Sequence, residues 1–260
     1  AAEITFREGA PDDLRGALIM LAESLGLRPS GMRSSICAVL LKAPDIQNNW
    51  SEYPNVIGEV RRLIEECPWH KVYDIAEQFY RDLETRGLGK ETTFQDRLNA
   101  FFVENGIGWS MESGLIVARG SEVFAKAPSD AIEQLTQTGR QTAAKEMREA
   151  MQDLSRRPHP DITGSIQHAM AALECTLRDF AGQPKKTLGE VLSAARGRGQ
   201  VLVPPPLDKA LELVWGYASE TGRHLREGRE PTFGEAELVV TISAAVCVYV
   251  ARAEPVSDVS

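Results

Sequence analysis

The C-terminal part of the sequence contains its most hydrophobic segment, and this segment does most to restrict the fold. Residues 238–251 carry no charged side chain. Thr232 and Glu235 precede the run at the spacing of a capping box, so a helix is expected to begin there. The run is shorter than the roughly 20 apolar residues that span a bilayer. It therefore predicts a buried helix in a helical core.

Apolar residues recur at helical spacing along most of the remaining chain. In the first half, helices are predicted over residues 14–25, 32–42, 54–66, 69–83 and 94–102. In the second half, two helices broken near Gly139 are predicted within 121–157. They are followed by helices over 162–180, from a second capping box at Thr187 and Glu190, and from Leu207 to Gly222.

The period changes once, where residues 107–111 and 115–119 read as two strands around Glu112-Ser113-Gly114. An isolated hairpin is marginally stable, so it must pack on the neighbouring helices. The predicted fold class is mainly α, with two helical domains and one short β-hairpin in the N-terminal half. The expected domains are 1–138, with the hairpin near 105–119, and 139–260.

The chain has 260 residues and a formal net charge of −8. Such an acidic balance argues against broad, nonspecific binding to nucleic acid, although a local basic patch can still bind it. The four cysteines lie far apart without metal-like spacing, and three of them sit in apolar helical runs typical of buried free thiols. No signal peptide or membrane segment is visible, which predicts a cytoplasmic protein. No metal or cofactor site is predicted.

Arg223 and His224 are the best candidates for chemistry, because they follow the helix end at Gly222 side by side. Neighbours on a helix point about 100° apart, so both reach one phosphate only where a helix end or loop presents them. Glu174 falls on the apolar stripe of the helix over 162–180. An acid facing a core needs a partner, and Arg223 or His224 is the expected one.

Several segments occur in an order that resembles a known protein family. The N-terminal half contains F-R-E-G near residue 6, P-W-H-K-V-Y-D-I-A-E at 68–77 and then L-N-A-F-F-V-E-N-G-I-G-W. The C-terminal half contains H-P-D-I-T-G-S-I-Q-H-A-M-A-A-L-E, K-T-L-G-E-V-L and G-R-H at 222–224. The chain resembles AbiJ-type abortive-infection proteins, in which a helical AbiJ N-terminal domain precedes a HEPN-like domain.

This resemblance implies an antiphage role and a metal-independent endoribonuclease in the C-terminal domain, without a cofactor. It implies RNA as a partner and a homodimer through that domain, with a further protein or antitoxin partner left open and no membrane partner. His224 would act as general acid or base, Arg223 would hold the phosphate, and Glu174 would orient them. The residues expected to contact RNA are Arg226, Arg229 and His168. HEPN sites usually separate the Arg from the His by a handful of residues, whereas here they are adjacent.

Two other interpretations remain open. Arg223 and Glu174 could form a buried ion pair that fixes helix packing, with His224 merely satisfied beside them. The C-terminal domain could then be a noncatalytic module that binds RNA, a nucleotide or a protein partner. A nucleotidyl-transfer enzyme is set aside, because the sequence has no P-loop, no paired-Asp strand and no Gly-rich strand-to-helix turn.

Overall fold

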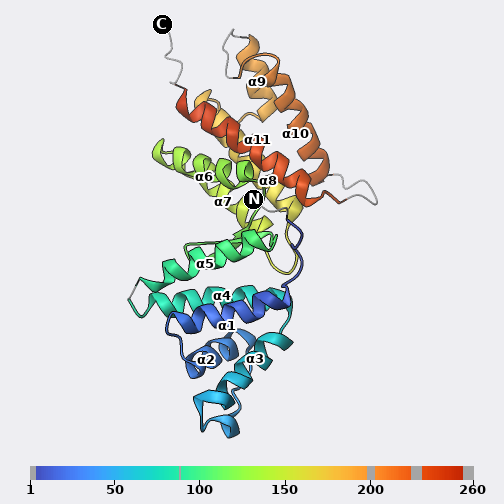
Figure 1. Ribbon diagram of the computed structural model, residues 1–260. Coiled ribbons are helices and arrows are strands. Elements are labelled where there is room, and N and C mark those ends of the chain that lie inside the picture. Colours follow the sequence, from blue (N-terminus) through green and yellow to red (C-terminus); the bar gives the residue numbers. More distant parts are fainter. Residues whose placement is uncertain (1–3, 88, 198–202, 224–229, 254–260) are drawn as a thin grey trace. The chain divides into compact units, whose positions relative to one another are not determined.

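The computed structural model of the protein describes residues 4–87, 89–197, 203–223 and 230–253. It is mainly helical, with a single hairpin in this part of the chain, which confirms the predicted fold class (Figure 1). The chain forms two compact units, Ala1–Arg119 and Gly120–Ser260. This division falls earlier than the boundary expected at 138/139, because the helix over 122–137 packs on helices of the second unit.

Unit 1 holds five α-helices, two short helical turns and the hairpin within its described residues. The helices are α1 (Asp12–Ser24), α2 (Pro29–Leu40), α3 (Ile57–Glu66), α4 (Trp69–Glu84) and α5 (Lys90–Glu104), with η1 (Ile46–Asn48) and η2 (Glu52–Val56) between α2 and α3. Acidic residues occupy the first turn of α1, and α2 begins on a proline. Both features suit helix N-termini.

Tyr73 lies at the centre of the unit 1 core. Its ring centroid lies 6.0 Å from that of Trp69, 5.5 Å from that of Trp109 and 6.0 Å from that of Phe102. Its buried hydroxyl donates a 2.8 Å hydrogen bond to the carbonyl oxygen of Gly9. This cluster joins α4, α5, the hairpin and the N-terminal segment.

The hairpin consists of β1 (Trp109–Glu112) and β2 (Leu115–Ala118), paired antiparallel. Ser113 and Gly114 both have positive φ, as a tight two-residue hairpin turn requires. A Cβ on Gly114 would lie 2.4 Å from a ring carbon of Tyr80, so the turn also needs glycine for close packing. The first strand begins at Trp109 instead of Ile107, and Ile107 forms an isolated parallel bridge with Phe6.

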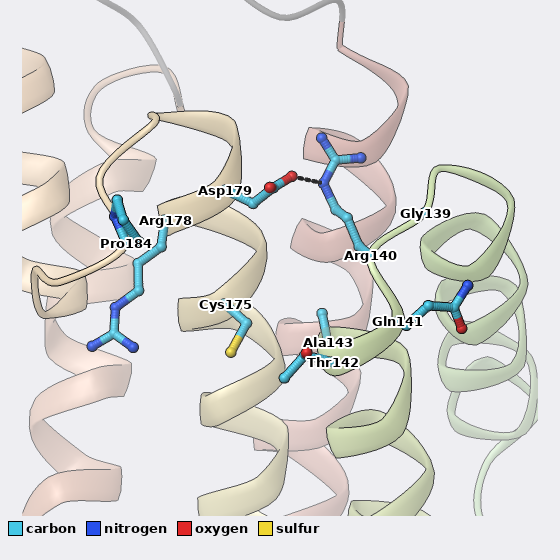
Figure 2. A pocket seen from close by; sticks show the side chains of 9 residues that line it. All are labelled: Gly139, Arg140, Gln141, Thr142, Ala143, Cys175, Arg178, Asp179 and Pro184. Carbon is cyan, nitrogen blue, oxygen red and sulfur yellow. Dashed lines mark ion pairs between the residues drawn. The ribbon is translucent and has the colours of Figure 1, made fainter.

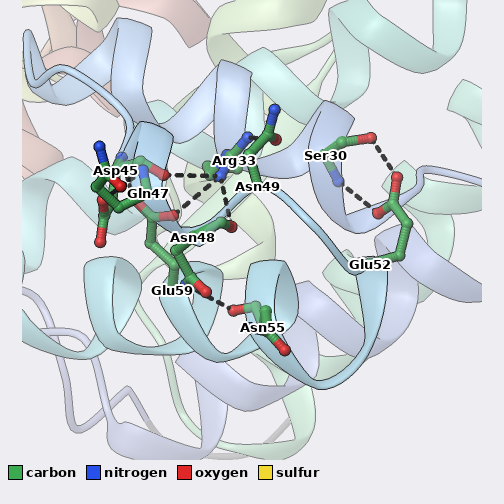
Figure 3. A network of polar contacts seen from close by, with 9 residues as sticks. All are labelled: Ser30, Arg33, Asp45, Gln47, Asn48, Asn49, Glu52, Asn55 and Glu59. Carbon is green, nitrogen blue, oxygen red and sulfur yellow. Dashed lines mark hydrogen bonds and ion pairs between the residues drawn. The ribbon is translucent and has the colours of Figure 1, made fainter.

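A buried ion pair fastens the segment between α2 and α3 (Figure 3). Arg33 and Glu59 are nearly inaccessible to solvent and lie 3.1 Å apart between Nη1 and Oε2. The other carboxylate oxygen of Glu59 accepts a 2.8 Å hydrogen bond from the backbone N–H of Asp45, and Arg33 donates a 2.7 Å bond to the side chain of Asn49. The network therefore fixes the segment between α2 and α3, which contains no strand and only the short helical turns η1 and η2.

Unit 2 is a bundle of helices, whose bounds are α6 (Glu122–Gln137), α7 (Gln141–Leu154), α8 (Ile162–Phe180), α9 (Leu188–Gly197), α10 (Leu207–Arg223) and α11 (Phe233–Arg252). The predicted break at Gly139 is present, and this glycine has a φ of 79°. Helix α8 contacts α7, α9, α10 and α11, while α11 also packs on α6. The core of unit 2 thus centres on α8.

Helix α11 begins as the sequence predicts. Thr232 accepts a hydrogen bond from the N–H of Glu235, and the Glu235 side chain accepts one from the N–H of Thr232. The helix has 20 residues and is long and apolar enough to cross a membrane by those two criteria alone. The helix is longer than the uncharged run over residues 238–251 from which it was predicted. One face of α11 is buried. Only 39% of its most apolar 18-residue stretch is buried inside the structure.

Removing the capping hydroxyl should weaken unit 2. Thr232→Ala is expected to lower the free energy of unfolding by about 1 kcal/mol, because the N–H of Glu235 loses its acceptor. Urea denaturation followed by the fluorescence of Trp215, the one tryptophan of unit 2, measures the loss. Ser129→Ala is the control, since that hydroxyl bonds only within α6. Equal stability of the two variants would contradict the capping role.

Candidate functional site

A cavity of about 370 Å³ lies between α8 and α10 in unit 2. The residues that line it are Gln167, Met170, Ala171 and Glu174 from α8, and Trp215, Ala218 and Ser219 from α10. Its volume lies within the range of small-molecule sites. The cavity combines an acid, an amide and a hydroxyl with an aromatic ring, so it can bind a polar group beside an apolar one.

Helix α10 connects this cavity to the predicted Arg-His pair. Trp215 and Ser219 lie four residues apart on one face of α10, and the helix ends at Arg223. His224, Arg226 and Arg229 lie outside the described residues. The predicted catalytic role of Arg223 and His224 therefore stays a prediction.

Glu174 is held in a polar network, as its place on the apolar stripe predicts. Its Oε1 accepts a 2.8 Å hydrogen bond from Nη2 of Arg178 and a 3.0 Å bond from the N–H of Leu188, the first residue of α9. The expected pairing of Glu174 with Arg223 or His224 stays a prediction, because His224 and the side chain of Arg223 lie outside what the structure describes. Within the described ranges, Oε2 of Glu174 accepts no hydrogen bond, so this oxygen can receive a further donor at the cavity.

Of the two partners of Glu174, Arg178 could have been predicted from the sequence. Glu174 and Arg178 are separated by four residues on α8, the spacing at which acid and base side chains meet on a helix. The contact with Leu188 follows from the turn between α8 and α9, where Thr187 and Glu190 form the predicted capping box. Glu174 thus helps to fix the start of α9, whatever else it does.

His168 lies on another side of α8, facing α7. Its Nδ1 is 2.7 Å from a carboxylate oxygen of Glu146, and its Nε2 is 3.7 Å from one of Asp153. Burial raises the pKa of Asp153, an effect that the charges of Arg156 and His168 oppose. Two carboxylates beside the ring repel phosphate groups. The RNA contact of His168 therefore stays a prediction that its neighbours do not favour.

A second cavity of about 360 Å³ lies between α8 and the start of α7 (Figure 2). Arg140 forms a 2.8 Å ion pair there with Asp179, while the guanidinium of Arg178 points away from this pair. Cys175 also lines the cavity, and burial raises the pKa of its thiol. The cations are thus already paired, and the thiol is kept from forming the nucleophilic thiolate.

Burial also raises the pKa of the other three thiols. Cys37, Cys67 and Cys247 are buried, as their apolar surroundings predict. Burial raises the pKa of Cys247 to about 12. Across residues 4–87, 89–197, 203–223 and 230–253, no three His, Cys, Asp or Glu side chains are grouped to hold a metal ion. The cavity beside Glu174 is therefore the strongest candidate site in the described part of the chain.

Comparison with known proteins assigns the N-terminal part of the chain. The family model of AbiJ N-terminal domain 4 matches residues 1–134, which is more than half of the sequence. No curated protein and no solved structure match the chain. The matched range contains unit 1 and most of α6, and it supports a role in abortive infection and defence. The chain therefore belongs to the AbiJ N-terminal domain 4 family.

Proposed function

We propose that the protein is an abortive-infection effector whose C-terminal unit is a HEPN-like, metal-independent endoribonuclease. Family membership supports the defence role. The observation that carries the enzymatic part is the cavity between α8 and α10, where Glu174 lines one wall and α10 leads to Arg223. RNA as substrate, a cytoplasmic location and a possible antitoxin belong to the same proposal.

In the proposed reaction, the 2′-hydroxyl of RNA attacks the adjacent phosphorus, and the 5′-oxygen of the next nucleotide leaves. His224 removes the hydroxyl proton or donates one to the leaving oxygen, because an unperturbed imidazole with a pKa of roughly 6.5 suits both roles near neutrality. Arg223 binds the phosphate oxygens and stabilises the charge that develops on them. The unbonded Oε2 of Glu174 is available to orient one of these two cations.

The second candidate is a noncatalytic module that binds RNA, a nucleotide or a protein partner. The net charge of −8 and the adjacency of Arg223 and His224 favour it. In this case Glu174 serves only the packing that the structure describes, through Arg178 and the start of α9.

Incubation of the purified full chain with labelled single-stranded and structured RNAs distinguishes the two functions. The enzyme is expected to cleave RNA equally well with and without EDTA, and to leave a 2′,3′-cyclic phosphate, since the attacking group is the neighbouring hydroxyl. The module is expected to bind RNA or a partner without cleaving it. Cleavage that requires a divalent metal ion would overturn the proposed mechanism.

A further inference from the structure

The cavity between α8 and α10 combines an aromatic side chain with room for a flat ring. Trp215 lines the cavity, and the small side chains of Ala171 and Ala218 leave space between the two helices. Every nucleobase has a π-face that can stack on an aromatic side chain, and unstacked bases of single-stranded RNA are usually bound in this way. The volume of about 370 Å³ is in the range of sites for small molecules. The cavity can therefore take a nucleobase.

The charge in the cavity suits a base and not a phosphate. Among the described residues that line the cavity, only Glu174 is charged, and a carboxylate repels phosphate groups. Its Oε1 is held at 2.8 Å by Nη2 of Arg178 and at 3.0 Å by the N–H of Leu188. Because the carboxylate is planar and one oxygen is fixed, the position of Oε2 is fixed as well. Glu174 thus presents an oriented acceptor to N–H donors of a ligand.

The chemistry of this acceptor favours one base. A carboxylate oxygen has two acceptor positions, and guanine is the standard base with two neighbouring N–H donors, at N1 and N2, on one edge. Adenine and cytosine present a single amino group beside an acceptor nitrogen, and uracil presents N3–H between two carbonyl oxygens, so a carboxylate repels part of each of these edges. The amide of Gln167 and the hydroxyl of Ser219 also line the cavity, and both groups can donate to a carbonyl oxygen such as O6 of guanine.

We propose that this cavity binds a guanine base, which stacks on Trp215 and donates from N1 and N2 to Oε2 of Glu174. The inference rests on the proposed function, because RNA supplies the base; a free guanine nucleotide has the same chemistry. In an RNA substrate, cleavage is then expected next to guanosine. Guanine occupies both acceptor positions of Oε2, so Glu174 serves recognition in place of orienting a cation.

Binding of uncleavable RNA to the full chain tests recognition separately from cleavage. The probes are short fluorescent 2′-O-methyl oligouridines, which lack the attacking hydroxyl and carry guanine, inosine, adenine or uracil at one central position. Fluorescence anisotropy should show that the guanine probe binds about 5- to 150-fold more tightly than the adenine and uracil probes, as a paired base edge usually does. Inosine lacks the N2 amino group and should fall between them. Unlabelled GMP that competes as strongly as RNA would identify a free nucleotide as the source of the guanine.

Variants of the lining residues test the two contacts. Trp215→Ala should weaken the binding of every probe by about 5- to 150-fold, and Trp215→Phe should lose less because it keeps an aromatic face. Glu174→Gln should remove the preference for guanine with little effect on the uracil probe, because its amide places a donor where an acceptor is needed. Leu213→Ala is the matched control, since Leu213 is 76% exposed on α10 and does not line the cavity. Circular dichroism establishes that the variants remain folded.

The outcomes for the cavity and for the ribonuclease are distinguishable. Equal affinity for the four probes overturns the guanine site, as does a wild type that binds neither the probes nor GMP. A guanine preference that survives both Glu174→Gln and Trp215→Ala also overturns it. Cleavage of ordinary RNA without regard to guanine retains the ribonuclease and removes the guanine site. Guanine-selective binding without cleavage retains the site and favours the binding module.

Discussion

Unit 1 should unfold about 3–5 kcal/mol more easily when Glu59 is replaced by alanine, because the change leaves the Arg33 guanidinium buried without its counter-ion. The pair is among the least exposed in the described structure, with side-chain exposures of 10% for Arg33 and 3% for Glu59. Asn49 still accepts a hydrogen bond from Arg33, which places the expected loss near the lower end of that range. The N–H of Asp45 also loses its acceptor.

Urea denaturation measures this loss through the fluorescence of Trp69 and Trp109, which pack on Tyr73 in the same unit. Glu52→Ala is the matched control. Glu52 is half-buried and accepts two hydrogen bonds from Ser30 near the start of α2, so its loss should cost about 1 kcal/mol or less. If Glu59→Ala is no less stable than Glu52→Ala, the buried pair does not hold the loop.

A double variant separates two contributions to the stability loss in Glu59→Ala: the unpaired buried charge of Arg33 and the lost hydrogen bond to the N–H of Asp45. Replacing Arg33 with methionine and Glu59 with leucine removes both charges and retains most of the side-chain volume. This variant should regain much of the stability lost in Glu59→Ala, since apolar substitutes for a buried ion pair are often neutral. Hydrogen exchange over residues 45–56 should still increase in it, because the N–H of Asp45 remains without an acceptor.

The sequence was sufficient for features that depend on residues within one or two helical turns. Thr232 with Glu235, and Thr187 with Glu190, form the predicted capping boxes. Helix breaks were predictable for the same reason, as at Gly139, where the backbone adopts a positive φ. The mainly α fold class follows from such local signals, because apolar spacing and capping together determine where helices form.

Contacts between distant residues could not be predicted. Arg33 and Glu59 lie on different helices, and nothing in either local pattern reveals that they are paired. His168 was expected to contact RNA, yet its nearest charged partner is Glu146 on α7. The packing of α6 with unit 2 likewise depends on which apolar faces meet. These contacts depend on how the helices pack against one another, and the residue spacing within a single sequence does not determine that packing.

Glu174 illustrates both what local sequence signals predict and what they miss. Its place on an apolar stripe correctly predicts a hydrogen-bonded acid. Its expected pairing with Arg223 or His224 stays a prediction, and in the structure Oε1 bonds to Arg178 and Leu188. The local partner, Arg178, was predictable from helical spacing. The cavity beside Glu174 was not, since it forms where α8 and α10 fail to fill the space between them.

Replacing His224 with alanine is expected to lower the single-turnover rate of RNA cleavage by about 10²–10⁴-fold, the usual contribution of a positioned general acid or base. Arg223→Ala should lower the rate by a similar factor, because it removes the phosphate contact and the stabilisation of developing charge. Arg223→Lys should restore little, since an ammonium cannot form the bidentate contact. His159→Ala is the matched control, because His159 is exposed between two prolines.

Glu174→Gln tests whether the acid of the cavity positions the catalytic pair. Glutamine keeps one oxygen acceptor for Arg178 and Leu188, so the fold should survive while the negative charge is lost. If Glu174 orients His224, the variant should lower kcat with little change in KM, and shift the pH–rate profile towards lower pH, because the carboxylate no longer favours the imidazolium. A change in thermal stability alone would assign Glu174 to packing.

Activity in His224→Ala equal to that of His159→Ala would remove His224 from the mechanism and leave the binding module as the better account.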